Sequence, residues 1–286
     1  TRCSRDWSSD VCSSDLMKYF ISDLIVGMKH FAEFADWIES NEDPDLGIEF
    51  TAFTHDEAYW QALAAKVPQM TCPLTFHGPY VNIEATSDIG SEENVWLMES
   101  YKKVFALAMQ NRVRHVVFHY SQLQFEPEEI PQKQKNAYWV MKKLTDMAAQ
   151  MKVNFVIENL CRQKHGVHLF SNEEYFRIFQ NIPQAQSLID IGHAHVNGLD
   201  IERFLATYGK RVKGFHVHNN DGKADQHLDY HHGTADIRQI MHWAGKYTED
   251  ADIVIEYEPH EKLTHAELLD EMHELKSWVE EGKALS

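Results

Sequence analysis

The segment 216–236, HVHNNDGKADQHLDYHHGTAD, concentrates histidine, aspartate and asparagine side chains that can bind a divalent metal. It contains two overlapping Asp-x-His triplets, Asp225-x-His227 and Asp229-x-His231. Imidazole and carboxylate ligands without thiolate suit Zn²⁺ or Mn²⁺ better than an iron–sulfur cluster or Cu⁺. The segment alone therefore offers candidate metal ligands, but it does not decide whether a metal binds or which triplet would contribute.

Further candidate ligands stand at the ends of predicted strands. They are His77, His119, Glu158, Asp190, His193, His218 and Glu256. Because side chains alternate across a strand, one residue at each strand end can point into a common space. Buried imidazoles and carboxylates that converge are costly unless they pair with each other or with cations. The conjunction therefore favours a metal over a purely structural role.

The elements that must position these residues follow a regular alternation of short apolar runs and segments of helical period. The predicted strands span 18–26, 47–53, 73–78, 114–120, 154–159, 186–193, 212–219 and 252–258, and the helices 30–40, 56–67, 93–111, 134–151, 172–182, 200–209, 235–247 and 265–282. No glycine-rich phosphate loop follows the first strand, which argues against a dinucleotide-binding sheet. The pattern predicts an α/β fold, a single-domain (β/α)₈ TIM barrel with its chemistry at the carboxyl ends of the strands.

The first sixteen residues differ from the rest, because they are rich in Ser, Asp and Cys and have no apolar period. We interpret residues 1–16 as a non-native leader derived from a sequencing adapter, and 17–286 as the barrel. Outside the leader only Cys72 and Cys161 occur, with no CxxC pair, which is typical of a reducing compartment. No apolar run is long enough to span a membrane. We therefore expect a cytoplasmic location.

Six sequence pieces carry a family resemblance. FHGPY, VVFH, VIEN, LIDIGHAH, HNNDGKADQHL and VIEYE, in this order between residues 76 and 258, resemble the xylose-isomerase-like barrel superfamily. That superfamily includes sugar and sugar-phosphate isomerases and epimerases, and the endonuclease four abasic-site nucleases. The resemblance implies a TIM barrel for nearly all of the chain after Met17.

The two branches imply different metal sets. The epimerase branch implies one divalent cation held by Glu158, Asp190, His218 and Glu256. There the two glutamates also act as catalytic groups, which move a proton beside a metal-polarised carbonyl. The nuclease branch implies three zinc ions, with additional ligands at His77, His119, His193 and an Asp-x-His pair. The expected cofactor is therefore Zn²⁺ or Mn²⁺, in one to three ions.

The resemblance also addresses the choice of triplet. In many isomerase-like members an Asp-x-His-Leu follows the seventh strand within a few residues, which selects Asp225 and His227. His231 stands where these members usually have glycine, so Asp229 and His231 stay an alternative. His216 and His195, which neighbour candidate ligands, are expected to have supporting roles.

The loop after Glu158 offers two cations. Arg162 and Lys164 are predicted to bind a phosphate of the substrate, although a solvated loop fits the sequence equally.

These features predict a metal-dependent isomerase or epimerase of a sugar or sugar phosphate. The alternative is a zinc-dependent phosphodiesterase of the abasic-site endonuclease type. The formal net charge of −17 and the acidic loops NIEATSDIGSEEN and QFEPEEIPQ disfavour a nucleic-acid or anionic membrane partner. We expect a small-molecule partner, and an oligomer is compatible with the sequence.

Overall fold

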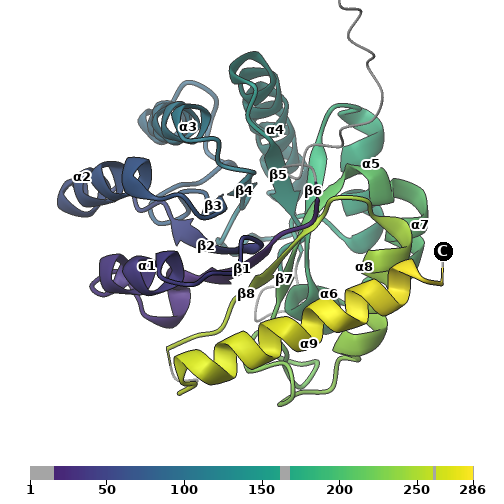
Figure 1. Cartoon of the computed structure of the whole chain (residues 1–286). Helices are drawn as coiled ribbons and strands as arrows, with labels where there is room; N and C mark the ends of the chain where they lie inside the picture. The colour runs from purple at the N-terminus through teal and green to yellow at the C-terminus, as the bar shows by residue number, and fades with distance from the viewer. Residues whose placement is uncertain (1–15, 162–167, 260–261, 286) are drawn as a thin grey trace, which may run out of the picture.

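The computed structural model describes residues 16–161, 168–259 and 262–285. Its parallel strands close into one barrel in chain order, from β1 to β8, and β8 pairs with β1 (Figure 1). The strands are β1 (Tyr19–Ser22), β2 (Leu46–Thr51), β3 (Leu74–His77), β4 (Val116–Phe118), β5 (Phe155–Glu158), β6 (Gln186–Asp190), β7 (Val212–Val217) and β8 (Asp252–Ile255). The predicted TIM barrel is therefore confirmed.

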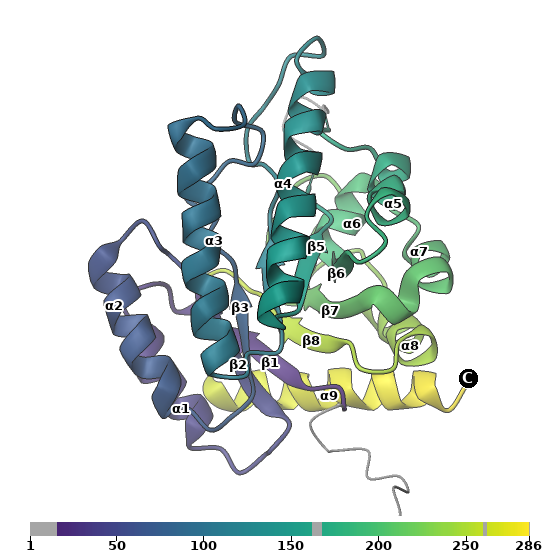
Figure 2. The same cartoon turned by 90° about the horizontal axis from the view of Figure 1, so that it is seen from above.

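Helices surround the strands on the outside of the barrel (Figures 1 and 2). The α-helices are α1 (Phe31–Glu39), α2 (Glu57–Lys66), α3 (Glu92–Gln110), α4 (Ile130–Met151), α5 (Asn172–Asn181), α6 (Ile191–Asn197), α7 (Ile201–Tyr208), α8 (Ile237–Tyr247) and α9 (His265–Lys283). Short 3₁₀ turns are η2 (Asp23–Ile25), η3 (Val67–Gln69) and η4 (Gly209–Arg211). None of these described helices is long and apolar enough to cross a bilayer.

Local sequence explains where several helices begin. The Ser171 side chain accepts a hydrogen bond from the Glu174 backbone N–H, and the Glu174 carboxylate accepts one from the Ser171 backbone N–H. This capping box starts α5 where the sequence predicts it, and such a cap typically contributes about 1 kcal/mol. Thr264 and Glu267 form the same box at α9. These caps fix how each helix leaves its preceding loop.

The sixth strand is shorter than predicted, and the α6 helix was not predicted. The sequence assigned residues 186–193 to one strand, but β6 ends at Asp190. The Asp190 side chain accepts a hydrogen bond of 2.6 Å from the His193 backbone N–H, so it caps α6 and turns the chain at once. His193 therefore lies in the first turn of a helix above the barrel.

The interior of the barrel is partly polar. On β2, Ile48 and Phe50 belong to the apolar core between strands and helices, so Glu49 points the other way, into the barrel. The same parity on β7 turns His216 inward between Phe215 and Val217. A separate apolar cluster of Val117, Val156 and Leu188 also lies in the interior. Charged and apolar side chains thus share the space beneath the barrel mouth.

Candidate metal centre

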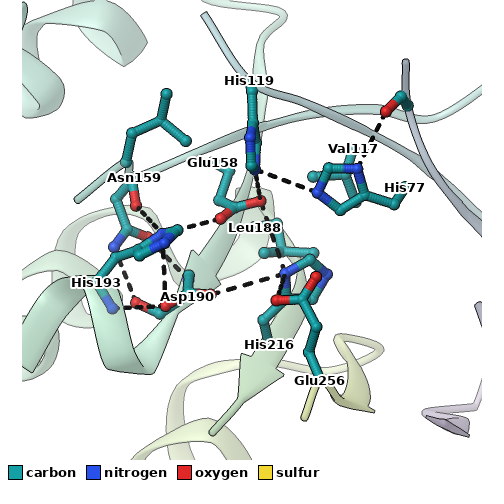
Figure 3. A network of polar contacts seen from close by, with 12 residues as sticks. His77, Val117, His119, Glu158, Asn159, Leu188, Asp190, His193, His216 and Glu256 are labelled. Atoms are coloured by element: carbon teal, nitrogen blue, oxygen red, sulfur yellow. Dashed lines mark hydrogen bonds and ion pairs between the residues drawn. The ribbon is translucent and has the colours of Figure 1, made fainter. Parts of the chain in front are cut away.

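The predicted ligands meet at the carboxyl end of the barrel, where Figure 3 shows His77, His119, Glu158, Asp190, His193 and Glu256. His77, Glu158 and Asp190 are the last residues of β3, β5 and β6. His119, His218 and Glu256 each follow the last residue of β4, β7 and β8. The loop beyond β7 and the first turn of α6 bring in the remaining three, and all nine belong to groups whose ligand atoms lie within 4.8 Å of one another.

The first group contains His77, His119 and Glu158. Nε2 of His77 lies 3.2 Å from Nε2 of His119, which lies 2.9 Å from Oε2 of Glu158. Burial, and the positive charge of His119, lower the pKa of His77. The neutral imidazole of His77 therefore faces the imidazole of His119, which contacts the Glu158 carboxylate. A metal cation at this place would be coordinated by the nitrogen lone pairs of both rings.

The second group contains Asp190, His218 and Glu256. Nε2 of His218 lies 3.0 Å and 3.1 Å from the two carboxylate oxygens of Asp190. Gly192 makes room for this ring, because a Cβ atom added to Gly192 would stand 2.0 Å from Cε1 of His218. Sequence reasoning missed this role of Gly192, since its only signal is a glycine near the end of a predicted strand.

The third group contains His193, Asp225 and His227, with His218 at its edge. Oδ2 of Asp225 lies 3.0 Å from Nε2 of His193 and 3.2 Å from Nε2 of His227. His227 has a φ of 44°, in the left-handed region, and the bridge between Asn219 and Leu228 holds the loop against the end of β7. The loop therefore turns back over the barrel mouth.

The alternative triplet does not converge on this centre. Oδ1 of Asp229 accepts a hydrogen bond from the His231 backbone N–H at 2.7 Å, and Nε2 of His231 lies 3.5 Å from Oε2 of Glu274 on α9. His195 also lies apart, with Nε2 2.7 Å from the Thr234 hydroxyl. The structure thus gathers Asp225 with His227 and leaves Asp229 with His231 outside.

Three of the histidines share one manner of anchoring. Nδ1 of His77, His193 and His227 faces the backbone carbonyl of Gly78, Asn159 and Glu256, at 3.0, 3.0 and 2.9 Å. A carbonyl only accepts, so each Nδ1 donates, and each Nε2 is directed into the cluster. Metal-binding histidines commonly donate their other ring N–H in this way.

A buried carboxylate oxygen, Oε1 of Glu158, also supports the binding of a metal ion in the cluster. Nδ1 of His193 lies 3.0 Å from Oε1 of Glu158, but its N–H is directed to the Asn159 carbonyl. Oε1 of Glu158 is buried and accepts no hydrogen bond from the described residues. A buried anionic oxygen without a donor is costly. Nitrogen and oxygen donors around it fit Zn²⁺ or Mn²⁺.

The charges of the cluster are strongly coupled. Burial opposes ionisation of Glu158, but the charges of His119 and His216 outweigh it and hold the pKa of Glu158 well below its usual range. Burial likewise acts to lower the pKa of His227, but the hydrogen bond to Asp225 and the charge of Glu256 raise it to about 10. Glu158, Asp225 and Glu256, whose pKa values are all lowered, are thus ionised at neutral pH. A divalent cation would bind here in competition with protons on the imidazoles.

A cavity of about 330 Å³ opens over the cluster. Its wall is formed by Leu24, Thr51, His77, Tyr80, His119, Ser121, Gln122, Leu160, Cys161, His193, Asp225, His227, Glu256 and Glu258. Glu256 lines the cavity and Glu158 lies behind the wall. Arg162 and Lys164, the predicted phosphate contacts, lie outside the described residues. Sequence reasoning missed Tyr80, Ser121 and Gln122, because neutral loop residues carry no ligand pattern.

Comparisons with known proteins agree with the barrel fold. A D-tagatose 3-epimerase-like protein superposes with a TM-score of 0.75 and 17% identity, over 94% of this chain and 99% of that one. The 3-keto-D-glucoside 4-epimerase YcjR from E. coli gives 0.66 and 14%, over 92% and 99%. The IOLI protein with a bound zinc atom gives 0.68 and 14%, over 92% and 98%. At these identities the likeness establishes the fold.

A curated sequence relative covers less. An uncharacterized protein of Methanocaldococcus jannaschii, MJ1614, is 31% identical over 85 residues, 30% of this chain, and the chain spans only about a third (32%) of that protein. The model of the xylose isomerase-like TIM barrel family, in contrast, matches residues 30–280. With the closed barrel and the residues at its mouth, this match shows that the chain belongs to the xylose isomerase-like TIM barrel family.

Proposed function

We propose that the protein is a divalent-metal-dependent isomerase or epimerase of a sugar or sugar phosphate. The observation that carries this proposal is the position of Glu256. Its carboxylate lines a polar cavity beside a cluster of imidazoles and carboxylates, and neighbouring His216 and His227 hold its pKa below the usual range although burial acts to raise it. An ionised carboxylate at the wall of a small cavity is suited to accept a proton from a substrate.

In this proposal Glu158, Asp190, His218 and Glu256 would hold one divalent cation. The ion would polarise a substrate carbonyl and so acidify the neighbouring carbon. Two further groups of candidate ligands raise the possible number of ions to three. One group contains His77 and His119, and the other contains His193, Asp225 and His227.

Proton transfer is assigned to Glu256 and Glu158. Glu256 faces the cavity, where it would accept a proton from the carbon next to the carbonyl. Glu158 is the proposed second group. It is ionised in the free protein, so the proton that it returns to the substrate must first reach it from solvent. It lies behind the cavity wall, 2.9 Å from His119, so its role depends on this contact opening when substrate binds. Glu256 is therefore the stronger candidate of the two.

The cavity supports a small polyol as the substrate. Its volume of about 330 Å³ falls at the small end of the range for small-molecule sites. The Tyr80 and Ser121 hydroxyls, the Gln122 amide and the Glu258 carboxylate offer polar contacts. The similar structures include a D-tagatose 3-epimerase-like protein and a 3-keto-D-glucoside 4-epimerase, which favours the same substrate class here. Arg162 and Lys164 are proposed to contact a phosphate where the substrate carries one.

One observation favours a second candidate, a zinc-dependent phosphodiesterase. Two additional ligand groups flank the one required for epimerisation, and several clustered cations would stabilise the leaving oxyanion of a phosphodiester. A polyanionic substrate also needs cationic contacts. Among the described residues no Lys or Arg lines the cavity, so we place this candidate second.

Metal analysis followed by a paired assay distinguishes the two functions. Metal-loaded protein is incubated with a panel of aldoses, ketoses and their phosphates, and separately with a DNA duplex that contains one abasic site. We expect sugar turnover that a chelator abolishes, and no strand cleavage. Strand cleavage without sugar turnover would favour the phosphodiesterase, and activity without bound metal would contradict both candidates.

A further inference from the structure

Glu49 is a buried carboxylate in the barrel interior that the proposed reaction does not use. It lies on β2 with no exposed surface. Its Oε2 atom accepts a hydrogen bond of 3.2 Å from the Thr75 hydroxyl, and its Oε1 atom lies 3.1 Å from Nε2 of His216 on β7. A buried charge is costly unless it is paired, so Glu49 and His216 depend on each other.

The opposite edge of the His216 ring contacts the metal centre. Its Nδ1 atom lies 3.1 Å from Oε2 of Glu256 and 3.6 Å from Oε2 of Glu158 (Figure 3). The ring is fully buried and lies outside the cavity wall. His216 therefore connects Glu49, deeper in the barrel, with Glu256 at the mouth. We call these three residues the clamp.

The clamp is not suited to hold a further cation, although its ligand atoms lie within 4.8 Å of one another. A metal ion needs its ligand atoms arranged around one point. His216 instead contacts the two carboxylates through opposite nitrogens, so its ring fills the space between them.

We propose that Glu49 is a positioning residue, which fixes the Glu256 carboxylate through the His216 ring without contacting metal or substrate. This inference rests on the proposed function, in which Glu256 is both a ligand and a proton acceptor. The backbone N–H of Glu256 donates a hydrogen bond of 3.2 Å to the Val217 carbonyl on β7, which fixes the backbone but not the carboxylate at the end of the side chain. The contact with His216 supplies that support.

Removal of a group that orients a metal ligand has an effect of typical size. Substitution of groups that orient metal ligands lowers metal affinity or activity about 10- to 100-fold. The Glu49→Gln variant keeps the shape of the side chain but removes the charge that holds the lower edge of the His216 ring. We expect the same number of bound ions, a metal affinity about 10- to 100-fold lower, and a changed ligand arrangement around the ion.

The test compares wild-type protein and Glu49→Gln with Co²⁺ and Zn²⁺ as the probes. The visible absorption spectrum of the Co²⁺ form reports the ligand arrangement, and competition titration gives the Zn²⁺ affinity. Asp252→Asn is the matched control. Asp252 is also buried in the barrel and lies 2.8 Å from Nε of Arg114 and 3.4 Å from Nδ1 of His115. Nε2 of His115 lies 4.0 Å from Oε2 of Glu49, so Asp252 is one residue further from His216 than Glu49 is. Asp252→Asn should therefore change both readouts less than Glu49→Gln does in folded protein.

Two results would overturn the inference. In the first, Glu49→Gln matches wild type in both readouts. In the second, Asp252→Asn shifts both readouts as much as Glu49→Gln does. Crystal structures of metal-free wild type and Glu49→Gln give a readout independent of metal. The inference predicts that the Glu256 carboxylate leaves its contact with His216 in the variant, and an unchanged contact would contradict it. A wild-type protein that binds neither ion would refute the proposed function, while the metal-free structures still decide the role of Glu49.

Discussion

Nε2 of His227 lies 3.2 Å from Oδ2 of Asp225, and both face the barrel mouth, although the next triplet along the chain has the same spacing. His231 packs instead against Tyr230 and Glu274 at the α9 side, with about half of its side chain exposed. The first triplet therefore joins the cluster and the second does not.

His227→Ala and His231→Ala form a matched pair of variants. Removal of the His227 imidazole should lower metal affinity about 10- to 100-fold or more. Loss of a group that only orients a metal ligand already has an effect of that size. His231→Ala should keep the metal content of wild type. Elemental analysis after dialysis against limiting Zn²⁺ measures both. Equal losses in the two variants would show that the structure does not identify the ligand pair.

Gly192 is predicted to be a packing requirement of the metal centre. In Gly192→Ala the new Cβ atom would overlap the His218 ring, which would have to leave its contact with Asp190. We expect weaker metal binding with the barrel intact. Ala194→Gly, in the same helix, adds no atom and is the control. Circular dichroism and metal titration check the prediction, which fails if the two variants bind metal equally well.

Metal binding should stabilise the fold. At a free Zn²⁺ concentration of about 100 times Kd, binding raises the free energy of unfolding by about 2.7 kcal/mol. For a domain of this size, that corresponds to a rise in Tm of roughly 5 °C. Thermal unfolding with Zn²⁺ and with a chelator measures the difference. His218→Ala should show a smaller response, and an equal response would mean that the ion binds elsewhere.

Asp23 gives a dependence of stability on pH that is separate from the metal. Burial raises its pKa from 3.8 to about 7, although hydrogen bonds from the Thr51 hydroxyl and backbone N–H act to lower it. The folded protein thus holds this proton more tightly than the unfolded chain. The resulting stability is fully present below about pH 4 and is lost as the pH rises through about 7.

Asp23→Asn keeps the size of the side chain and cannot ionise. Wild type should therefore lose up to a few kcal/mol of stability relative to the variant between about pH 5 and pH 8. Urea unfolding at the two pH values, in chelator, measures the difference. Parallel behaviour of the two proteins would show that Asp23 does not carry the raised pKa.

Much of the fold and of the cluster follows from sequence, because both depend on local patterns. Apolar runs reveal the strands, and the barrel geometry then brings His77, Glu158 and Asp190 to one end of the molecule. The α6 helix escaped prediction because its start depends on a side-chain cap by Asp190, inside an apolar run that reads as strand.

The contact of Glu49 with His216 was beyond the reach of a sequence pattern. Within the run GIEF, Glu49 reads as a single polar interruption of an apolar strand. Its partner lies 167 residues later on β7, and only closure of the barrel brings the two together. The residues of the cavity wall could not be predicted for a similar reason, because Tyr80 and Ser121 come from loops whose conformation depends on packing against the barrel.

The most direct test of the account is the transfer of deuterium from solvent to a sugar. Metal-loaded protein is incubated in D₂O with each sugar of the panel, and the products are analysed by NMR spectroscopy. The account predicts deuterium at the carbon next to the carbonyl, its loss with chelator, and a rate about 10²- to 10⁴-fold lower for Glu256→Gln. Sugar turnover without deuterium at that carbon, or unchanged exchange in Glu256→Gln, would contradict it.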